Sequence, residues 1–448
     1  MRGDRPATGE TPVQDPVADA AGASHETPDE VWQAEQLAGC DPRALAERFG
    51  TPLYVYDLDA LARRAARLRA ALPDQVDVAY AVKANPSLAV IARLRAAGIG
   101  ADVSSEGELA AALHAGIAPA SIVVTGPGKS DALLRRAVEL GVRAIAVDSP
   151  GEVARIEALT RADRRARLLF RVADPGDSGA GRGHGAGQVF GMDGEDALAA
   201  ARRAVEAEHL DPLGVHAFTV SAVLDARVLV DHVGRTVVAG RRLAHAAGFP
   251  LRLVDVGGGL GIPYGERDAP LDLAVFAAGV ARVLRDAAAD PALEALRILV
   301  EPGRYLAGPA GAYLARVVDV KRLDGRYVTI LDGGINHLLA PALPGRAHRM
   351  RLVRSDGPAD RESVPVVLTG PLCTGLDVLG RADAFPRPAP GDLVAFLDTG
   401  AYGFTQSMPW FLSHPGPAEV AASGGRAVLV RPRLDPSDLV ERQRIPSW

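Results

Sequence analysis

The chain has 448 residues, of which 48% are hydrophobic and 23% are charged, a composition typical of a globular protein with more than one domain. Its formal net charge of -5 and its two cysteines, Cys40 and Cys373, argue against a broad nucleic-acid-binding surface, a disulfide framework and a cysteine-based zinc site. Because no apolar run follows Arg2 and Arg5 or approaches about 18 residues anywhere, we expect a cytoplasmic protein with no membrane partner.

The first part of the chain divides into a polar tail and a long alternating region. Residues 1–30 contain almost no large apolar side chain, so we expect a flexible tail there. Further on, β-branched runs alternate with amphipathic stretches such as LAVIARLRAAG and ALLRRAVELG. The strand candidates are VDVAYAV (76–82), GADVSS (100–105), IVVTG (122–126), AIAVDS (144–149), RLLFRV (167–172), GVHAFTV (214–220), RLVDVGGG (252–259) and RILVEPG (297–303). This alternation predicts a parallel (β/α)8 barrel.

After residue 303 the pattern changes to strands joined by turns without helices between them. The candidates are YLARVVDVKRL, RYVTILDGG, VPVVLTGP, GDLVAFLDTG and RAVLVRP. They predict an antiparallel β domain. The segment YVYD (54–57) precedes the first barrel helix and is a candidate crossing between the domains. We therefore expect the barrel at 56–297 and the β domain at 31–55 with 298–448.

Lys83 is the first candidate for chemistry. It closes the apolar run AYAV, which places it at the carboxyl end of a barrel strand, where active sites lie in this fold. A lysine at a strand end is usually only a solvated charge. The functional interpretation is a partly desolvated amine that condenses with an aldehyde cofactor.

Two later segments have residues suited to binding phosphate and a ring nitrogen. DVGGGLGIPY (255–264) follows a strand, and its glycines let backbone N–H groups surround phosphate oxygens, although such a loop is more often only a tight turn. In EPGR (301–304), Glu301 suits a protonated pyridine nitrogen and Arg304 suits a phosphate. A surface ion pair is an equally good interpretation of EPGR.

Three loops complete the candidates. GPLCTGLDVLG (370–380) and DTGAYGFTQSMPWF (398–411) combine a cysteine, aspartates and aromatic residues. A lone cysteine is usually a small hydrophobic residue, but Cys373 lies between a Gly-Pro turn and a polar stretch, which favours an active-site role. The Gly-rich loop 174–193 contains Arg182 and His184, which we expect to be solvated.

In this order, the segments YAVKAN, DVSSEGEL, DVGGGLG, EPGR, GPLC and GAYG resemble the fold type III decarboxylases that depend on pyridoxal 5′-phosphate (PLP). This family contains ornithine, diaminopimelate and biosynthetic arginine decarboxylases. The similarity runs from about Leu53 to Val420. It implies an α/β fold, an alanine-racemase-like (β/α)8 PLP barrel with a second antiparallel β domain, and decarboxylation of an amino acid with PLP as cofactor.

The resemblance also implies roles for individual residues. Lys83 would carry the cofactor as a Schiff base, and Glu301 would bind the pyridine nitrogen. Cys373 would enter the active site of the partner subunit in a head-to-tail homodimer and protonate the carbon that loses carbon dioxide. No metal is implied. The other cofactor-binding positions are His216, Phe218, Ser221, Gly257, Gly258, Gly259, Gly303, Arg304 and Tyr402.

The chain departs from the family at two places. In GVHAFTVSAVLD, Phe218 replaces a second histidine that stacks on the cofactor ring, and Val220 replaces a glycine. A phenylalanine ring can still stack. Family members with basic substrates have an acidic residue directly after the cysteine, where this chain has Thr374. A buried cation without a carboxylate is costly, so we expect a substrate without a free distal amine, unless Asp377 substitutes.

Other segments bear on the substrate. HAFTVSAVLD, DGGINHLL, GPLCTGLDVLG and FLSHPGPAEV resemble a subgroup from specialised-metabolite and exopolysaccharide gene clusters, one type of which decarboxylates glutamate tethered to an acyl carrier protein. The expected partner is thus a small amino acid or an aminoacyl carrier protein. Asp332 and His337 in DGGINHLL (332–339) join Thr374 and Asp377 as substrate-binding candidates, although a strand-ending turn explains DGGINHLL equally well.

Two alternative functions stay open. An amino-acid racemase could use the same scaffold, but Glu301 argues against it, because racemases typically keep an arginine near the pyridine nitrogen. Phe218 and Val220 are compatible with a PLP-binding regulator that has lost catalysis, whereas the retained Lys83 and Cys373 argue for an enzyme.

Overall fold

The computed structural model describes residues 36–173, 189–265, 268–343, 346–353 and 361–447. The expected tail at 1–30, and Arg182 and His184 of the Gly-rich loop, lie outside these residues. Among the described residues, no helix has the length and hydrophobicity needed to cross a bilayer.

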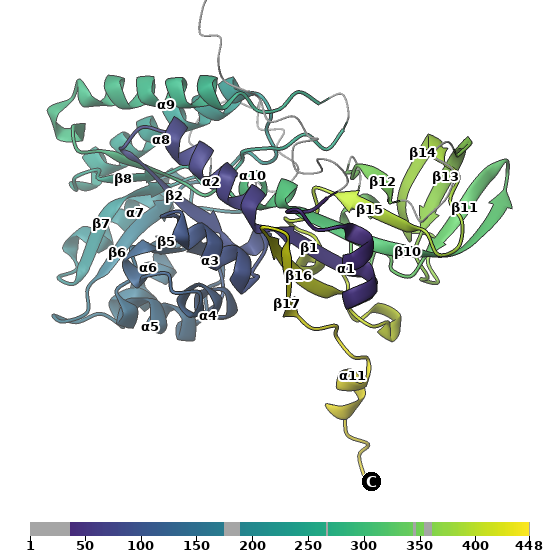
Figure 1. Ribbon diagram of the computed structural model, residues 1–448. Helices are drawn as coiled ribbons and strands as arrows, with labels where there is room; N and C mark the ends of the chain where they lie inside the picture. Colours follow the sequence, from purple (N-terminus) through teal and green to yellow (C-terminus); the bar gives the residue numbers. More distant parts are fainter. Residues whose placement is uncertain (1–35, 174–188, 266–267, 344–345, 354–360, 448) are drawn as a thin grey trace, which may run out of the picture.

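Eight parallel strands form a closed barrel, with the last strand hydrogen-bonded to the first (Figure 1). The strands are β2 (Val76–Ala81), β3 (Gly100–Val103), β4 (Ile122–Val124), β5 (Ala144–Val147), β6 (Ala166–Arg171), β7 (Leu210–His216), β8 (Leu253–Asp255) and β9 (Arg297–Val300). Their side chains are almost all buried, as expected for strands inside a ring of helices. The barrel predicted from the alternating pattern is confirmed.

Helices alternate with the barrel strands and cover the outside of the barrel (Figure 1). They are α2 (Leu58–Ala71), α3 (Leu88–Ala96), α4 (Glu106–His114), α5 (Asp131–Leu140), α6 (Pro150–Glu157), α7 (Gly194–Glu206), α8 (Ala226–Ala247) and α9 (Leu273–Ala288). Most begin at a serine or aspartate whose side chain accepts a hydrogen bond from the first turn, as Ser105 does for α4 and Asp193 for α7. These caps fix where each helix leaves the barrel mouth.

The second domain is built on a nine-stranded sheet, with the order β14-β13-β11-β10-β1-β16-β17 and with β15 joining β10 to β12. Its strands are β1 (Leu53–Asp57), β10 (Gly311–Leu323), β11 (Arg326–Leu331), β12 (Met350–Val353), β13 (Ser363–Thr369), β14 (Val378–Pro386), β15 (Leu393–Leu397), β16 (Ala418–Ser423) and β17 (Arg426–Arg431). The short helices α1 (Pro42–Phe49), α10 (Arg304–Ala307) and α11 (Ser437–Glu441) complete the chain.

The sheet is mixed, which corrects the expectation of an antiparallel domain. β1 pairs in parallel with β16, and β11 pairs in parallel with β13, while the other strand pairs are antiparallel. Parallel neighbours need a long connection. The whole barrel separates β1 from β16, and the segment containing β12 separates β11 from β13, so both connections are long enough.

β1 lies in the centre of the second sheet and leads directly into the barrel helix α2. Asp57 ends β1 and caps α2, because its carboxylate accepts hydrogen bonds from the backbone N–H groups of Asp59 and Ala60. The carboxylate also accepts one from the N–H of Ala38. The segment YVYD therefore crosses between the two domains, as the sequence suggested.

Candidate active site

A pocket lies at the carboxyl ends of the barrel strands, where loops from both domains meet. It collects nine of the residues that the sequence singled out. Its lining consists of Ala81, Lys83, Phe218, Ser221, Ala222, Gly258, Gly259, Leu260, Glu301, Gly303, Arg304 and Tyr402. We call it the Lys83 pocket.

Lys83 lies in a short 3-10 turn, η2 (Val82–Ala84), that follows β2. Its ammonium Nζ donates a hydrogen bond to Oδ2 of the buried Asp102, at 2.9 Å. The other oxygen of Asp102 accepts a hydrogen bond from the hydroxyl of Thr125. Burial alone would lower the pKa of Lys83, but the charges of Asp102 and Glu301 raise that pKa above its ordinary value.

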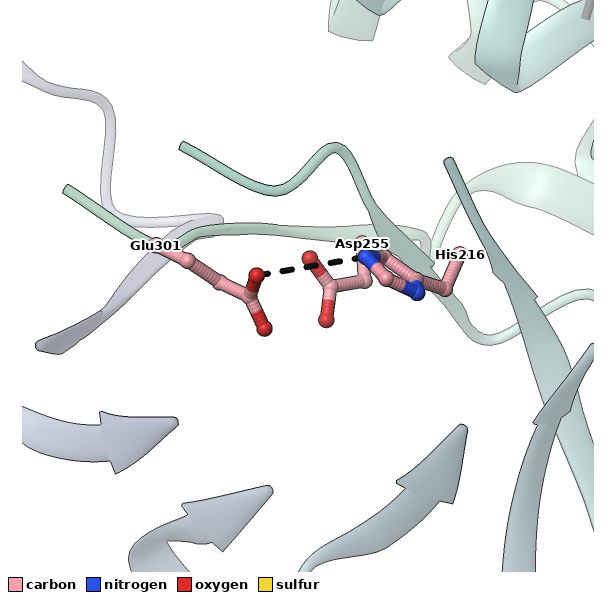
Figure 2. A group of neighbouring side chains, drawn as sticks. All are labelled: His216, Asp255 and Glu301. Atoms are coloured by element: carbon pink, nitrogen blue, oxygen red, sulfur yellow. Dashed lines mark ion pairs between the residues drawn. The ribbon is translucent and has the colours of Figure 1, made fainter. Parts of the chain in front are cut away.

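Three buried side chains lie beside the pocket at the ends of β7, β8 and β9. Figure 2 shows His216, Asp255 and Glu301 pointing toward one another, with 3.9 Å between His216 Nε2 and Glu301 Oε2. Burial and neighbouring carboxylates raise the pKa of Glu301 well above its ordinary value and raise the pKa of Asp255 to about 7. Burial lowers the pKa of His216 well below its ordinary value, so the imidazole is neutral.

This cluster has unused hydrogen-bonding capacity. Glu301 Oε1, Asp255 Oδ2 and both ring nitrogens of His216 are buried without a hydrogen-bond partner. Such groups are costly unless a ligand satisfies them. A protonated ring nitrogen beside Glu301 would supply both a donor and the compensating positive charge.

The glycine loop after β8 is closely packed against its neighbours. Gly257 has a φ of +64°, and a Cβ atom there would lie 2.8 Å from Cδ2 of Phe218. A Cβ atom on Gly258 would lie 2.7 Å from the carbonyl oxygen of Glu301. Only glycine therefore fits, and the loop presents bare backbone to the pocket, as a phosphate cradle requires.

Arg304 begins α10 at the side of the same pocket. Its Nη1 donates to the hydroxyl of Tyr264 at 2.7 Å, and its guanidinium carbon lies 4.7 Å from the ring centroid of Tyr402. The backbone N–H of Tyr402 donates to the carbonyl of Ala84, at 2.8 Å, so this β-domain loop is tied to the turn that carries Lys83. Both domains thus build the pocket.

The predicted residues of the GPLCTGLDVLG loop do not line the Lys83 pocket. Cys373 is exposed, and Thr374 is half-buried beside it. Asp377 is buried, and its two carboxylate oxygens accept hydrogen bonds from the N–H groups of Ile335, at 2.8 Å, and Leu372, at 2.7 Å. Asp377 therefore fastens the cysteine loop to the turn after β11.

Asp332 and His337 also lie away from the pocket lining, inside the β domain. Asp332 accepts hydrogen bonds from the Thr51 hydroxyl and from the N–H of Arg316. His337 contacts the hydroxyl of Tyr313 through Nδ1 and the carbonyl of Pro415 through Nε2, at 3.1 and 2.9 Å. Burial lowers the pKa of His337 to about 4, so it is neutral near pH 7.

The site contains functional groups that the sequence reasoning did not single out. Asp102 and Thr125 support Lys83, and Asp255 stands between Glu301 and the glycine loop. Asp102 and Asp255 each lie in the last residues of a buried apolar strand. Like Lys83, these two carboxylates lie where an apolar strand reaches the barrel mouth, and this position was the signal in the sequence.

The donor set fits PLP. Lys83 offers an amine for the aldehyde, Glu301 offers the ring nitrogen a buried carboxylate whose Oε1 has no hydrogen-bond partner, and Phe218 offers an aromatic face. The glycine loop with Arg304 offers backbone N–H groups and a guanidinium for the phosphate.

Comparisons with known proteins agree with this chemistry. Residues 58–308 match the family model described as pyridoxal-dependent decarboxylase, pyridoxal binding domain. The chain is 33% identical over 410 residues to an L-glutamyl-[BtrI acyl-carrier protein] decarboxylase of Niallia circulans, covering 89% of this chain and 95% of that protein. It is 34% identical over 421 residues to a diaminopimelate decarboxylase of Methanothermobacter thermautotrophicus, covering 92% and 96%.

Solved structures show the same similarity. A diaminopimelate decarboxylase from M. jannaschi superposes with a TM-score of 0.85 at 28% identity, covering 92% of this chain and 96% of that one. The Helicobacter pylori diaminopimelate decarboxylase complexed with L-lysine gives a TM-score of 0.80 at 28% identity, covering 89% and 98%. The chain therefore belongs to the pyridoxal-dependent decarboxylases, enzymes that use PLP to remove a carboxyl group from an amino acid.

Proposed function

We propose that this enzyme decarboxylates an amino acid or aminoacyl group whose distal end carries no free amine, and that the natural form is attached to a carrier protein through its side-chain carboxyl group, which leaves the α-carboxylate free to depart. The proposal rests on the hydrogen bonding of the Asp377 carboxylate. Both of its carboxylate oxygens already accept backbone hydrogen bonds, and the residue after Cys373 is the neutral Thr374. The position directly after Cys373 thus offers no carboxylate to a distal ammonium group, and Asp377 is buried against the backbone of its own loop, so burying an unpaired cation beside Thr374 would be costly.

The relatives support both a carrier-bound and a free substrate class. One is named for a glutamyl group on an acyl-carrier protein, and others are named diaminopimelate decarboxylases. Diaminopimelate carries a second ammonium group at its distal end. Because Thr374 and Asp377 leave that charge without a partner in the loop, the carrier-bound class agrees better with this chain.

When bound, PLP withdraws electrons from the α-carbon, so that the carboxylate can leave as carbon dioxide. Lys83 would hold the aldehyde end of the cofactor, and Glu301 would hold a proton on the ring nitrogen. The ring of Phe218 would offer an aromatic face to the cofactor and exclude water from it. The glycine loop and Arg304 would bind the phosphate and so orient the substrate's carboxylate.

We further propose that Cys373 works in the pocket of a partner subunit, in a head-to-tail homodimer. Its thiol is exposed and lies outside the lining of the Lys83 pocket of its own chain. There it would return a proton to the α-carbon after carbon dioxide leaves. The buried carboxylate of Asp377 would hold the loop in the shape that presents the thiol.

The test is carbon dioxide release from a panel of substrates with purified enzyme and PLP. The panel contains a glutamyl group on a carrier protein, free L-glutamate, diaminopimelate and L-lysine, and the Lys83→Ala variant is the blank. We expect the highest kcat/KM for the carrier-bound glutamyl group and the lowest for L-lysine. Preference for L-lysine or diaminopimelate would overturn the substrate assignment, and α-proton exchange without carbon dioxide would favour a racemase.

A further inference from the structure

A second pocket, of about 440 Å³, lies in the β domain beside the cysteine loop. Its volume is within the range of small-molecule sites. The pocket is lined by Pro341, Ala342, Arg346, Ala347, His348, Met350, Gly375, Leu376, Val378, Leu379, Gly380 and Arg381. We call it the Arg346 pocket.

The charged side chains in the described lining are all positive. Arg346 and Arg381 both border the pocket, and none of the described residues that line it is acidic. Neither guanidinium has an ion pair within the described parts of the chain. His348 is buried and bonded through Nδ1 to the carbonyl of Leu397, at 2.8 Å, and burial lowers its pKa to about 4, so it is neutral. The pocket therefore favours an anion.

The Arg346 pocket is linked to the Lys83 pocket by two aromatic side chains. Arg304, which lines the Lys83 pocket, donates to the hydroxyl of Tyr264 at 2.7 Å. The ring of Tyr264 meets the ring of His348 edge-on, with 5.2 Å between centroids, and His348 lines the Arg346 pocket. Tyr264 and His348 therefore connect the two pockets through side-chain contacts.

The other boundary of the Arg346 pocket is the cysteine loop. Gly375 and Leu376 line the pocket two and three positions after Cys373. The pocket wall is closely packed at Gly380, because a Cβ atom there would clash with the sulfur of Met350. The pocket thus lies between Tyr264, which accepts a hydrogen bond from Arg304, and the loop whose Cys373 we assign to proton transfer in the partner subunit's site.

We propose that the Arg346 pocket binds the phosphodiester-bearing arm through which a carrier protein presents its aminoacyl group, an inference that rests on the proposed function. Water occupies roughly 30 Å³ per molecule, so this pocket has room for about fifteen waters, far more than one carboxylate fills. Met350, Leu376, Val378 and Leu379 suit an aliphatic chain, and the two guanidinium groups suit a phosphate.

The test compares the wild-type enzyme, with PLP bound, and the double variant Arg346→Gln, Arg381→Gln. The matched control is Arg326→Gln, which removes an exposed arginine of the neighbouring strand β11 that pairs with Asp383 outside the pocket. Three substrates carry the same glutamyl group: one on an arm ending in a phosphodiester, one on that arm ending in a hydroxyl, and free L-glutamate.

We expect the double variant to raise KM roughly tenfold or more for the phosphodiester arm alone, with kcat nearly unchanged. The control variant should leave all three KM values unchanged. Equal KM changes for all three substrates, or no change for the phosphodiester arm, would overturn the proposal. A KM change for free L-glutamate alone would instead assign the pocket to a distal carboxylate and would also overturn it.

A calorimetric titration separates this proposal from the proposed function. The probe is the phosphodiester arm without an amino acid, and it is added to each variant with PLP bound. Binding to wild type and to Arg326→Gln but not to the double variant would support the Arg346 pocket even if no substrate in the panel released carbon dioxide. Equal binding to all three proteins, or binding to none, would overturn the pocket assignment whatever the enzyme decarboxylates.

Discussion

The ammonium group of Lys83 and the carboxylate of Asp102 form an ion pair of 2.9 Å across the adjacent strands β2 and β3. The Thr125 hydroxyl, after β4, holds the other oxygen of Asp102. Three neighbouring strand ends therefore set the position of the amine. They also keep it protonated before the cofactor arrives, since Asp102 raises the pKa of Lys83 against the effect of burial.

This ion pair predicts how cofactor capture depends on pH. Only the neutral amine attacks an aldehyde, so capture by cofactor-free enzyme rises as pH rises toward the pKa of Lys83. Asp102→Asn removes the largest charge that raises this pKa, so the fraction of neutral amine, and with it the capture rate at a fixed pH, should rise about tenfold or more. Stopped-flow absorbance of the lysine–cofactor bond, measured across pH, checks this.

Thr125→Val is the matched control for that experiment. It removes a hydrogen bond to Asp102 but keeps the carboxylate charge, so its capture rate at each pH should stay close to that of wild type. An unchanged capture rate in Asp102→Asn would show that the ion pair does not govern Lys83.

A second prediction concerns the stability of the cofactor-free protein. Burial raises the pKa of Asp255 from 3.8 in the unfolded chain to about 7. Between these two pH values the folded state therefore keeps a proton that the unfolded state releases. The contribution of Asp255 to the free energy of unfolding is thus greatest below pH 4 and falls as the pH rises toward 7. Each unit of difference between the folded and unfolded pKa values corresponds to about 1.4 kcal/mol in the free energy of unfolding.

Denaturant unfolding at pH 5 and pH 7.5 measures this loss. Asp255→Asn has no proton to release, so its free energy of unfolding should fall less between the two pH values than that of wild type. The comparison uses the difference between pH values within each protein, because the substitution itself changes stability. The same loss in both proteins would assign the pH dependence to other groups.

The alternation of strands and helices was enough to predict the barrel, but strand ends depended on tertiary contacts. The run GVHAFTV was expected to be a strand over 214–220, whereas β7 ends at His216. Beyond that point the chain turns into the mouth of the barrel, where Val220 packs against Gly259 and Phe218 packs against Gly257. β-branched composition alone does not reveal such a turn.

Strands of the second domain were harder to predict from sequence. β12, β14 and β16 were not expected, because MRLV is short, VLGRADAFP contains glycine, proline and charges, and AEVAAS is rich in alanine. These strands form because they pair with well-defined neighbouring strands, as β16 pairs with β1. The roles of Asp377 and Asp332 were also hidden, because backbone N–H groups leave no mark on the sequence and Thr51, the other partner of Asp332, is 281 positions away along the chain.

The departure at Phe218 leads to a third prediction. Phe218→Ala removes the aromatic face beside the cofactor site, and we expect the Kd for PLP to rise roughly tenfold to a hundredfold. Phe218→His keeps a ring, so it should stay within a few-fold of wild type. Absorbance titration with PLP measures both Kd values. If Phe218→Ala bound PLP as tightly as wild type, the ring of Phe218 would not form part of the cofactor site.

The shared active site gives a fourth prediction. Lys83→Ala and Cys373→Ala should each be nearly inactive when purified alone. After mixing, unfolding and refolding, half of the dimers would be mixed, and each mixed dimer would contain one complete site, so activity should return to about one quarter of wild type. No recovery, with mixed dimers demonstrated by mass spectrometry, would place Cys373 and Lys83 in the same subunit's site or outside catalysis.

The most direct test of the account is the chemical identity of the lysine that binds PLP. The sequence contains three lysines, Lys83, Lys129 and Lys321, and Lys129 is buried in an ion pair with Glu152. Borohydride reduction with PLP, followed by peptide mass spectrometry, should place the label on Lys83, and unreduced enzyme from the same preparation should release carbon dioxide from an aminoacyl substrate. A label on Lys129 or Lys321, or no label, would contradict the account.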